Sequence, residues 1–251
     1  MRVAAIYDIH ANVSALEAVL SEIRQTQVDH IVIGGDVLPG PLPRETIQCL
    51  LDVDIPVQFI HGNGDREVLA QMSGVETDWY RTASEQWREP VRWTAQQLRS
   101  QHQHLLSSWP LTCRVEIPGL GNVLFCHATP RNDTEIFTRL TPEDRLMPIF
   151  EGLGVSTVVC GHTHMQFDRM IGTIRVVNAG SVGMPFGEPG ADWLLLGPDI
   201  GLRHTYYDLA RAAERIRSTT YPQAEDFAAR NVLQAPSEEE ALTAFTGAEL
   251  R

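Results

Sequence analysis

Residues that can bind metal ions follow several apolar runs of this chain. Asp8 and His10 come directly after residues 3–7, and Asp36 follows a similar run. Carboxylate, imidazole and amide groups bind hard to borderline divalent cations, and two-cation sites typically carry out phosphoryl transfer. The candidates lie in five short clusters: Asp8-Ile9-His10, Gly35-Asp36, Gly62-Asn63-Gly64-Asp65, Cys126-His127 and Gly161-His162-Thr163-His164.

Each cluster taken alone has a simpler explanation. A short Asp-X-His or His-X-His sequence is often a capped turn or a histidine whose hydrogen bonds are satisfied inside the protein. The five clusters share a further property, because each follows a run of strand-forming residues where a buried strand would otherwise end in an apolar or turn residue. We therefore expect them to meet at one edge of a sheet and to form a two-metal site.

The elements that position these clusters begin with an alternation of strand and helix patterns over the first seventy residues. Ser14 and Glu17 have the spacing of a helix cap. The alternation predicts a parallel sheet whose loops at the carboxyl ends of the strands form a crevice. The expected strands are residues 3–7, 30–34 and 57–60, and the expected helices are residues 14–25 and 44–51.

Residues 67–109 are rich in Gln, Glu, Arg and Trp and predict a helical insertion. Within it, residues 85–107 predict one or two amphipathic helices interrupted near Pro90. The insertion either covers the surface or faces the substrate as a lid. After Pro110 we expect mostly strands, at residues 113–117, 123–126, 157–160, 174–177, 193–196 and 202–207, with helices at 141–150, at 208–217 and after Ser237.

Composition narrows the class of protein. The 251 residues predict one domain, 1–251, with a helical tail over about 208–251. The net charge of −12 disfavours stable nucleic-acid binding, and the complete absence of lysine excludes P-loop and Schiff-base chemistry. No apolar stretch reaches the roughly 18 residues of a membrane span, and the first apolar run is too short for a signal peptide, so we expect a cytoplasmic protein. The four cysteines form no CxxC pair, which argues against a disulfide framework.

The order and spacing of the five clusters resemble the calcineurin-like metallophosphoesterase superfamily. Asp8-Ile9-His10-Ala11-Asn12 and the later Asn178-Ala179-Gly180-Ser181-Val182-Gly183 are most similar to its small prokaryotic phosphodiesterase branch. The resemblance runs from Met1 to about Leu209 and implies an α/β fold, a four-layer α/β/β/α sandwich with the metals at its sheet edge.

The resemblance also implies the ligand sets. Asp8, His10, Asp36 and His164 bind one metal ion, and the expected metals are Mn²⁺, Fe²⁺/Fe³⁺ or Zn²⁺. The second metal ion is bound by Asn63, His127 and His162, and Asp36 bridges the two ions. The resemblance then implies catalytic roles for Asp36, Asn63 and His127. In this mechanism, a hydroxide held between two ions about 3.5–4 Å apart attacks phosphorus in line with the leaving oxygen.

One position departs from the family pattern. Many members have a His after the motif Asn, where it assists the leaving group, but this chain has Gly64. A general acid contributes about 10²–10⁴-fold, so we expect slow hydrolysis of esters with poor leaving groups unless another group substitutes. His61 is one candidate substitute, with a structural histidine as the alternative. We expect Asp65 to support a metal ligand by orienting His10 or another imidazole.

Other residues have two interpretations each. Asn12 either donates to a phosphate oxygen or caps the following helix. Arg131 either clamps phosphate or is a solvated loop residue. Phe186 and Trp79 either stack on a base or aryl group or serve as ordinary packing residues.

The prediction is a metal-dependent phosphodiesterase acting on a small phosphate ester or nucleotide, with no membrane partner and with homo-oligomerisation left open. The alternatives are a dinucleoside polyphosphate or nucleotide pyrophosphate hydrolase, a protein phosphatase, and a non-catalytic scaffold. Loss of metal ligands would indicate the scaffold, and none is lost here.

Overall fold

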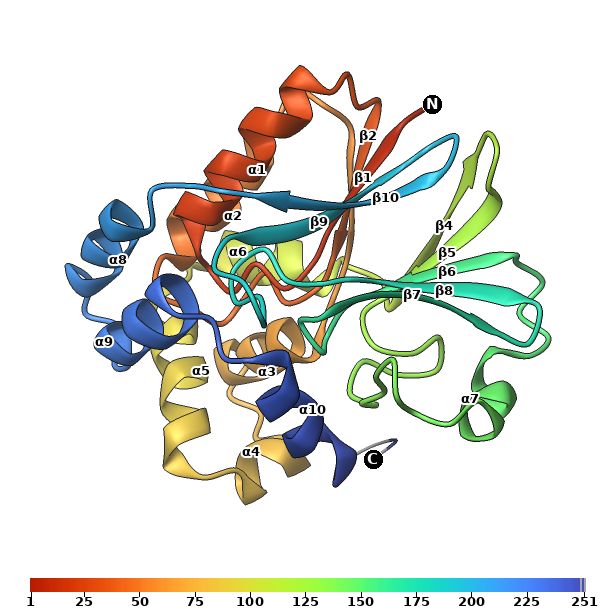
Figure 1. Ribbon diagram of the computed structural model, residues 1–251. Coiled ribbons are helices and arrows are strands. Elements are labelled where there is room, and N and C mark those ends of the chain that lie inside the picture. Colours follow the sequence, from red (N-terminus) through yellow and green to blue (C-terminus); the bar gives the residue numbers. More distant parts are fainter. Residues whose placement is uncertain (249, 251) are drawn as a thin grey trace.

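Two five-stranded sheets form the centre of the computed structural model, which describes residues 1–248 and 250 (Figure 1). The first sheet has the order β10-β9-β1-β2-β3, in which β1, β2 and β3 are parallel and β9 and β10 are antiparallel additions. The second has the order β4-β5-β6-β8-β7, with β5, β6 and β8 parallel. The strands are β1 (Val3–Ile6), β2 (His30–Gly34), β3 (Val57–Ile60), β4 (Thr112–Ile117), β5 (Gly121–Cys126), β6 (Thr157–Cys160), β7 (Gln166–Ile171), β8 (Ile174–Ala179), β9 (Ala191–Leu196) and β10 (Ile200–Thr205).

The sheets pack face to face with helices outside them. Val3 and Ala5 of β1 lie in the apolar layer between the sheets, together with Phe125 and Val177 of the second sheet. Side chains alternate along a strand, so Ala4 and its alternate neighbours face the helices instead. The α/β/β/α sandwich is therefore confirmed, and burial on both faces explains why β1 is continuously apolar.

The helices flank these layers. In Figure 1, α1 and α2 lie along the first sheet and α7 lies on the far side of the second. Helices α5 and α6 pack against α3. The helices are α1 (Val13–Gln25), α2 (Pro43–Leu51), α3 (Asn63–Met72), α4 (Asp78–Thr82), α5 (Glu85–Gln97), α6 (Ser100–Ser107), α7 (Glu143–Phe150), α8 (Leu209–Arg217), α9 (Ala224–Phe227), the π-helix η1 (Ala228–Leu233) and α10 (Glu238–Thr246).

Some expected boundaries were wrong. Helix α1 is capped by Asn12 rather than Ser14, because the Asn12 side chain accepts from the backbone N–H of Ala15. Pro90 lies inside α5, and the break before α6 comes at Leu98, which is buried in extended backbone. Helical structure starts at Asn63, four residues before the expected insertion.

Strand β7 was missed by the sequence analysis. It is an edge strand with charged, solvent-facing residues between its buried ones. Near the C-terminus, Asp208 caps α8 and Ser237 caps α10, as expected, whereas residues 249 and 251 of the expected tail lie outside the described residues. Among the residues that the structure describes, no helix is both long and apolar enough to span a membrane.

Candidate metal centre

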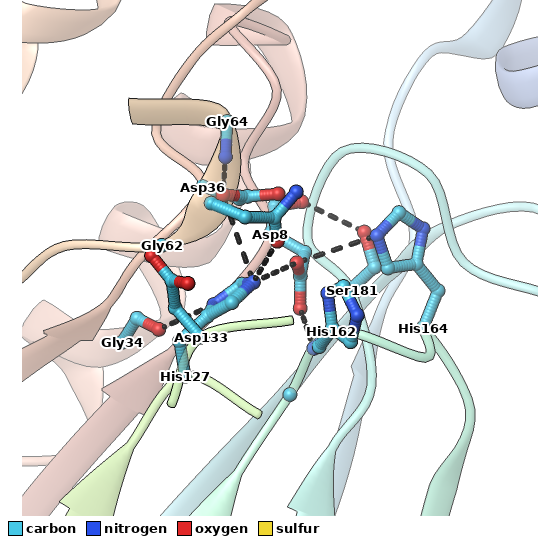
Figure 2. A network of polar contacts seen from close by, with 12 residues as sticks. Asp8, Gly34, Asp36, Gly62, Gly64, His127, Asp133, His162, His164 and Ser181 are labelled. Carbon is cyan, nitrogen blue, oxygen red and sulfur yellow. Dashed lines mark hydrogen bonds and ion pairs between the residues drawn. The ribbon is translucent and has the colours of Figure 1, made fainter. Parts of the chain in front are cut away.

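The seven predicted ligands lie in the segments that follow β1, β2, β3, β5 and β6. Figure 2 shows Asp8, Asp36, His127, His162 and His164 close together. Figure 2 shows Asp8 and Asp36 between His127 on one side and His164 on the other. The first sheet supplies its ligands from the ends of β1, β2 and β3, and the second from the ends of β5 and β6. In that order they are Asp8, His10, Asp36, Asn63, His127, His162 and His164.

Five of these ligands have left-handed backbone, which non-glycine residues rarely adopt. Such a conformation costs about 1–3 kcal/mol per residue and persists where the surrounding structure imposes it. The concentration at one place indicates that the fold holds these side chains for a function. The φ angles are 52° for Asp8, 45° for His10, 48° for Asp36, 67° for His162 and 55° for His164.

One group of ligands surrounds the imidazoles of His10 and His164. Their Nε2 atoms lie 3.2 Å apart. Oδ1 of Asp8 is 3.3 Å from Nε2 of His164 and 3.9 Å from Nε2 of His10. Oδ2 of Asp36 lies 3.8 Å from Nε2 of His10. Asp8, His10 and His164 are close enough to share one cation, and Asp36 borders this group through His10.

A second group surrounds His127. Its Nε2 lies 3.1 Å from Oδ1 of Asn63 and 3.6 Å from Oδ1 of Asp36. With the Asn63 amide turned round, its nitrogen would lie 3.0 Å from Nδ1 of His162. The turned amide would satisfy more hydrogen bonds, but a metal ligand must present oxygen between the two imidazoles, as it does here. Asp36 directs one oxygen to each group.

The acceptor atoms at the centre fit divalent cations. Oδ1 of Asp8 is buried and has no hydrogen-bond partner, although His127 and His164 lie within 4 Å of it. Oδ2 of Asp8 accepts from the backbone N–H of His162 at 2.8 Å, which fixes the carboxylate. A buried acceptor without a donor is costly, and a cation shared with neutral imidazoles removes that cost.

Backbone carbonyls fix the histidine tautomers. Nδ1 of His127 lies 3.0 Å from the carbonyl of Gly34, and Nδ1 of His164 lies 2.9 Å from that of Met184. Nε2 of His162 lies 3.2 Å from the carbonyl of Thr134. A carbonyl only accepts, so each of these nitrogens carries the proton and the other ring nitrogen presents a lone pair to the centre.

Burial and neighbouring charges shift the pKa values at the centre. Burial lowers the pKa of His10 and that of His162 to about 3, aided by the charges of His164 and His127 respectively, so both rings stay neutral. Burial opposes ionisation of Asp8, but His164 and His127, when protonated, outweigh it and hold the Asp8 pKa below its usual range. Burial and the charge of Asp8 raise the pKa of Asp36. A cation between the carboxylates would favour ionisation of both.

The sequence pattern of the calcineurin-like phosphoesterase superfamily domain matches residues 1–197. The chain belongs to this superfamily. A metallophosphoesterase from Sphaerobacter thermophilus has a similar structure, with a TM-score of 0.71, 27% identity and coverage of 92% of this chain and 100% of that one. The cluster of candidate ligands therefore lies in a calcineurin-like phosphoesterase domain.

Two archaeal proteins are also similar. The uncharacterized protein MJ0912 of Methanocaldococcus jannaschii is 27% identical over 241 residues, which cover 88% of this chain and 94% of that protein. The hypothetical protein PH1004 from Pyrococcus horikoshii OT3 shares the fold, with a TM-score of 0.77 at 19% identity, over 90% of this chain and 97% of that one.

Position 64, where many members of the superfamily have a His, has no room for a side chain. A Cβ on Gly64 would lie 2.3 Å from the carbonyl oxygen of Leu38 and 2.8 Å from Cδ of Pro39. The backbone N–H of Gly64 donates to Oδ1 of Asp36 at 2.7 Å. Gly64 thus holds the candidate ligand Asp36 by its backbone, while the loop containing Leu38 occupies the space that a side chain would need.

Asp65 does not orient an imidazole, contrary to our expectation. Its two oxygens accept from the backbone N–H groups of Leu38 and Gly62, both at 3.0 Å. Burial, followed by the charge of Asp36, raises the Asp65 pKa to about 7. Asp65 therefore ties together the loops that carry two ligands.

The residues with two interpretations do not join the ligand groups. The Asn12 side chain is fully buried and, besides capping α1, donates to the carbonyl of Gly183 at 3.1 Å. Arg131 is half exposed and its Nε lies 2.7 Å from Glu135. His61 faces a cavity of about 160 Å³ beside α6, with Nδ1 3.5 Å from Asp133.

The sequence does not indicate some of the groups that support the candidate metal centre. Asp133 accepts from Arg66 at 2.8 and 3.2 Å beside the Asn63 loop, and nothing in its sequence surroundings indicates this. Carbonyl groups that orient imidazoles have no sequence signal. By contrast, the Asn178–Ser181 motif was noticed, and its side chains hold ligand loops: Asn178 donates to the carbonyl of Gly161 at 2.7 Å and Ser181 to that of Asp8 at 2.7 Å.

Proposed function

We propose that this protein is a metal-dependent phosphodiesterase with a dinuclear centre. The observation that carries the proposal is the position of Asp36, whose two oxygens face separate imidazole groups at 3.8 and 3.6 Å. Beside it, Oδ1 of Asp8 is buried without a donor. A scaffold that had lost catalysis would have no need to keep these strained ligands together.

The ligand groups assign the residues to two ions. Asp8, His10 and His164 would hold one ion, Asn63, His127 and His162 the other, and Asp36 both. Mixed nitrogen and oxygen donors suit Mn²⁺, Fe²⁺/Fe³⁺ or Zn²⁺. Such ions, when bound, supply positive charge for phosphate oxygens and make a water molecule more acidic.

The surroundings of Gly64 favour esters whose leaving group needs little protonation. A Cβ at position 64 would lie 2.3 Å from the carbonyl oxygen of Leu38, which leaves no room for the family's histidine. A missing general acid costs about 10²–10⁴-fold for poor leaving groups. This supports aryl or otherwise activated diesters over unactivated Ser and Thr phosphate esters, and so disfavours a protein phosphatase.

The arginines near the ligand loops are already engaged by acids. Arg66 contacts Asp133 at 2.8 Å, and Arg131 contacts Glu135 at 2.7 Å. A dinucleoside polyphosphate or nucleotide pyrophosphate carries further phosphates, which guanidinium groups bind best when they are free to do so. With a net charge of −12, the chain is better suited to a substrate with a single phosphate.

Metal dependence tests the proposal. Protein stripped by a chelator should lose hydrolysis of bis-p-nitrophenyl phosphate and regain it when Mn²⁺ is added, because the buried carboxylates and imidazoles need the cation. Release of p-nitrophenolate measures the rate, with Mg²⁺ in place of Mn²⁺ as the comparison. Persistent inactivity of protein shown to contain bound Mn²⁺ would contradict the proposal.

A further inference from the structure

Helix α10 follows the matched superfamily domain in sequence, but it packs against loops beside the candidate metal centre. The backbone N–H of Gly187 donates to the carbonyl of Pro236 at 2.8 Å, just before α10. Within α10, Glu238 contacts Arg139 at 2.6 Å. After it, the N–H of Leu250 donates to the carbonyl of Ile136 at 2.8 Å.

These contacts connect α10 to two loops that orient metal ligands. Residues 184–190 contain Met184, whose carbonyl holds His164, and residues 131–140 contain Thr134, whose carbonyl holds His162. Figure 1 shows α10 at the end of the molecule where these loops lie, on the same side as α3. Helix α10 therefore spans one side of the centre.

The rings of Phe186 and Phe245 connect His164 of the candidate centre to α10. The Phe186 ring lies 5.6 Å from the His164 ring at 31°, and the N–H of Phe186 donates to the carbonyl of His164 at 3.1 Å. The Phe245 ring of α10 lies 6.1 Å from Phe186. Both phenylalanines are only partly buried, unlike the core pair Phe137 and Phe150, so part of each ring remains accessible.

We propose that Phe186 and Phe245 form a stacking wall for an aromatic ring of the substrate, either an aryl group esterified to the phosphate or the base of a nucleotide. The inference rests on the proposed function, because it requires the phosphate to bind beside His164. The charges around the wall suit a neutral ring. Glu188, two residues from Phe186, is exposed, and the nearby guanidinium of Arg139 is paired with Glu238, so the rim would repel further phosphates.

Binding of phosphonates to the Mn²⁺-loaded full-length protein tests the wall without relying on turnover. Isothermal titration calorimetry should show that phenylphosphonate binds more tightly than methylphosphonate, because only the first carries a ring. Phe245→Ala should reduce phenylphosphonate affinity about tenfold, within the range for loss of an aromatic stacking partner. The affinity for methylphosphonate should stay unchanged. Trp87→Ala, which removes an exposed ring from α5, should alter neither affinity.

Phe245→Leu is a second variant that controls for displacement of α10. Leucine keeps an apolar contact but has no ring, so this variant should still weaken the binding of phenylphosphonate selectively. An unchanged preference for phenylphosphonate in both variants would overturn the wall, as would equal weakening of both ligands, which indicates support of the metal loops instead. Selective weakening without any hydrolysis of diesters would support the wall and contradict the proposed function. Failure of both phosphonates to bind would contradict the wall, while diester hydrolysis by the same Mn²⁺-loaded protein would test the proposed function separately.

Discussion

Asp36→Asn should reduce diester hydrolysis by about 10²–10³-fold or more, the usual loss when one preorganised charge-stabilising group is removed. Asp36 directs one oxygen toward each of the two imidazole groups. Asparagine has the same shape and can still accept from the N–H of Gly64, so the fold should survive. The loss of negative charge should lower the bound metal, which elemental analysis of the dialysed variant measures together with the hydrolysis rate.

A matched control for this substitution is Asp199→Asn. Asp199 lies in the turn between β9 and β10, is 83% exposed and pairs with Arg175. Its neutralisation removes the same charge without touching a ligand, and surface changes of this kind alter stability by about 0.5 kcal/mol or less. If Asp36→Asn kept the metal content and turnover of Asp199→Asn, the shared position of Asp36 would have no functional meaning.

Gly64→Ala should destabilise the protein by about 1–3 kcal/mol or more, the cost of forcing extra atoms into a packed site. The added methyl group would lie 2.3 Å from the backbone oxygen of Leu38 and 3.0 Å from Oδ1 of Asp36. Backbone must move to relieve the contact, so Asp36 should shift and activity should fall with stability. Thermal unfolding and diester hydrolysis measure the two effects.

Gly247→Ala provides the comparison, because a Cβ there meets no atom within 4 Å among the described residues. It should unfold like the wild type. Gly64→His should lose stability and activity as Gly64→Ala does, because the imidazole would meet the same crowded backbone. It should therefore not gain the family's general acid. A stable Gly64→His variant with increased monoesterase activity would show that the loop containing Leu38 yields easily.

The clustering of the candidate ligands could be predicted because its signal is local. Asp8, Asp36 and His127 each follow a buried strand, and parallel strands bring such positions to a common edge. The same reasoning found β1 and β2, which are apolar on both faces. It missed β7, an edge strand on which the charged residues Asp168 and Arg169 interrupt the apolar pattern.

The remaining features depend on contacts between distant segments. Asp65 was expected to orient an imidazole, but its partners are backbone N–H groups, which every residue has and no sequence pattern marks. The pairing of Arg66 with Asp133 joins residues 67 positions apart. The return of α10 to Phe186 likewise depends on the path of the whole chain, although the cap of the helix at Ser237 was recognisable.

Electron paramagnetic resonance of the Mn²⁺-reconstituted protein tests the dinuclear centre most directly. Ions held on either side of Asp36, about 3.5–4 Å apart as in two-metal enzymes, should give the signal of an exchange-coupled pair, with two Mn²⁺ per chain. Asp36→Asn should replace that signal with one from isolated ions. Isolated Mn²⁺ in the wild type at saturating metal, or a single ion per chain, would contradict the account.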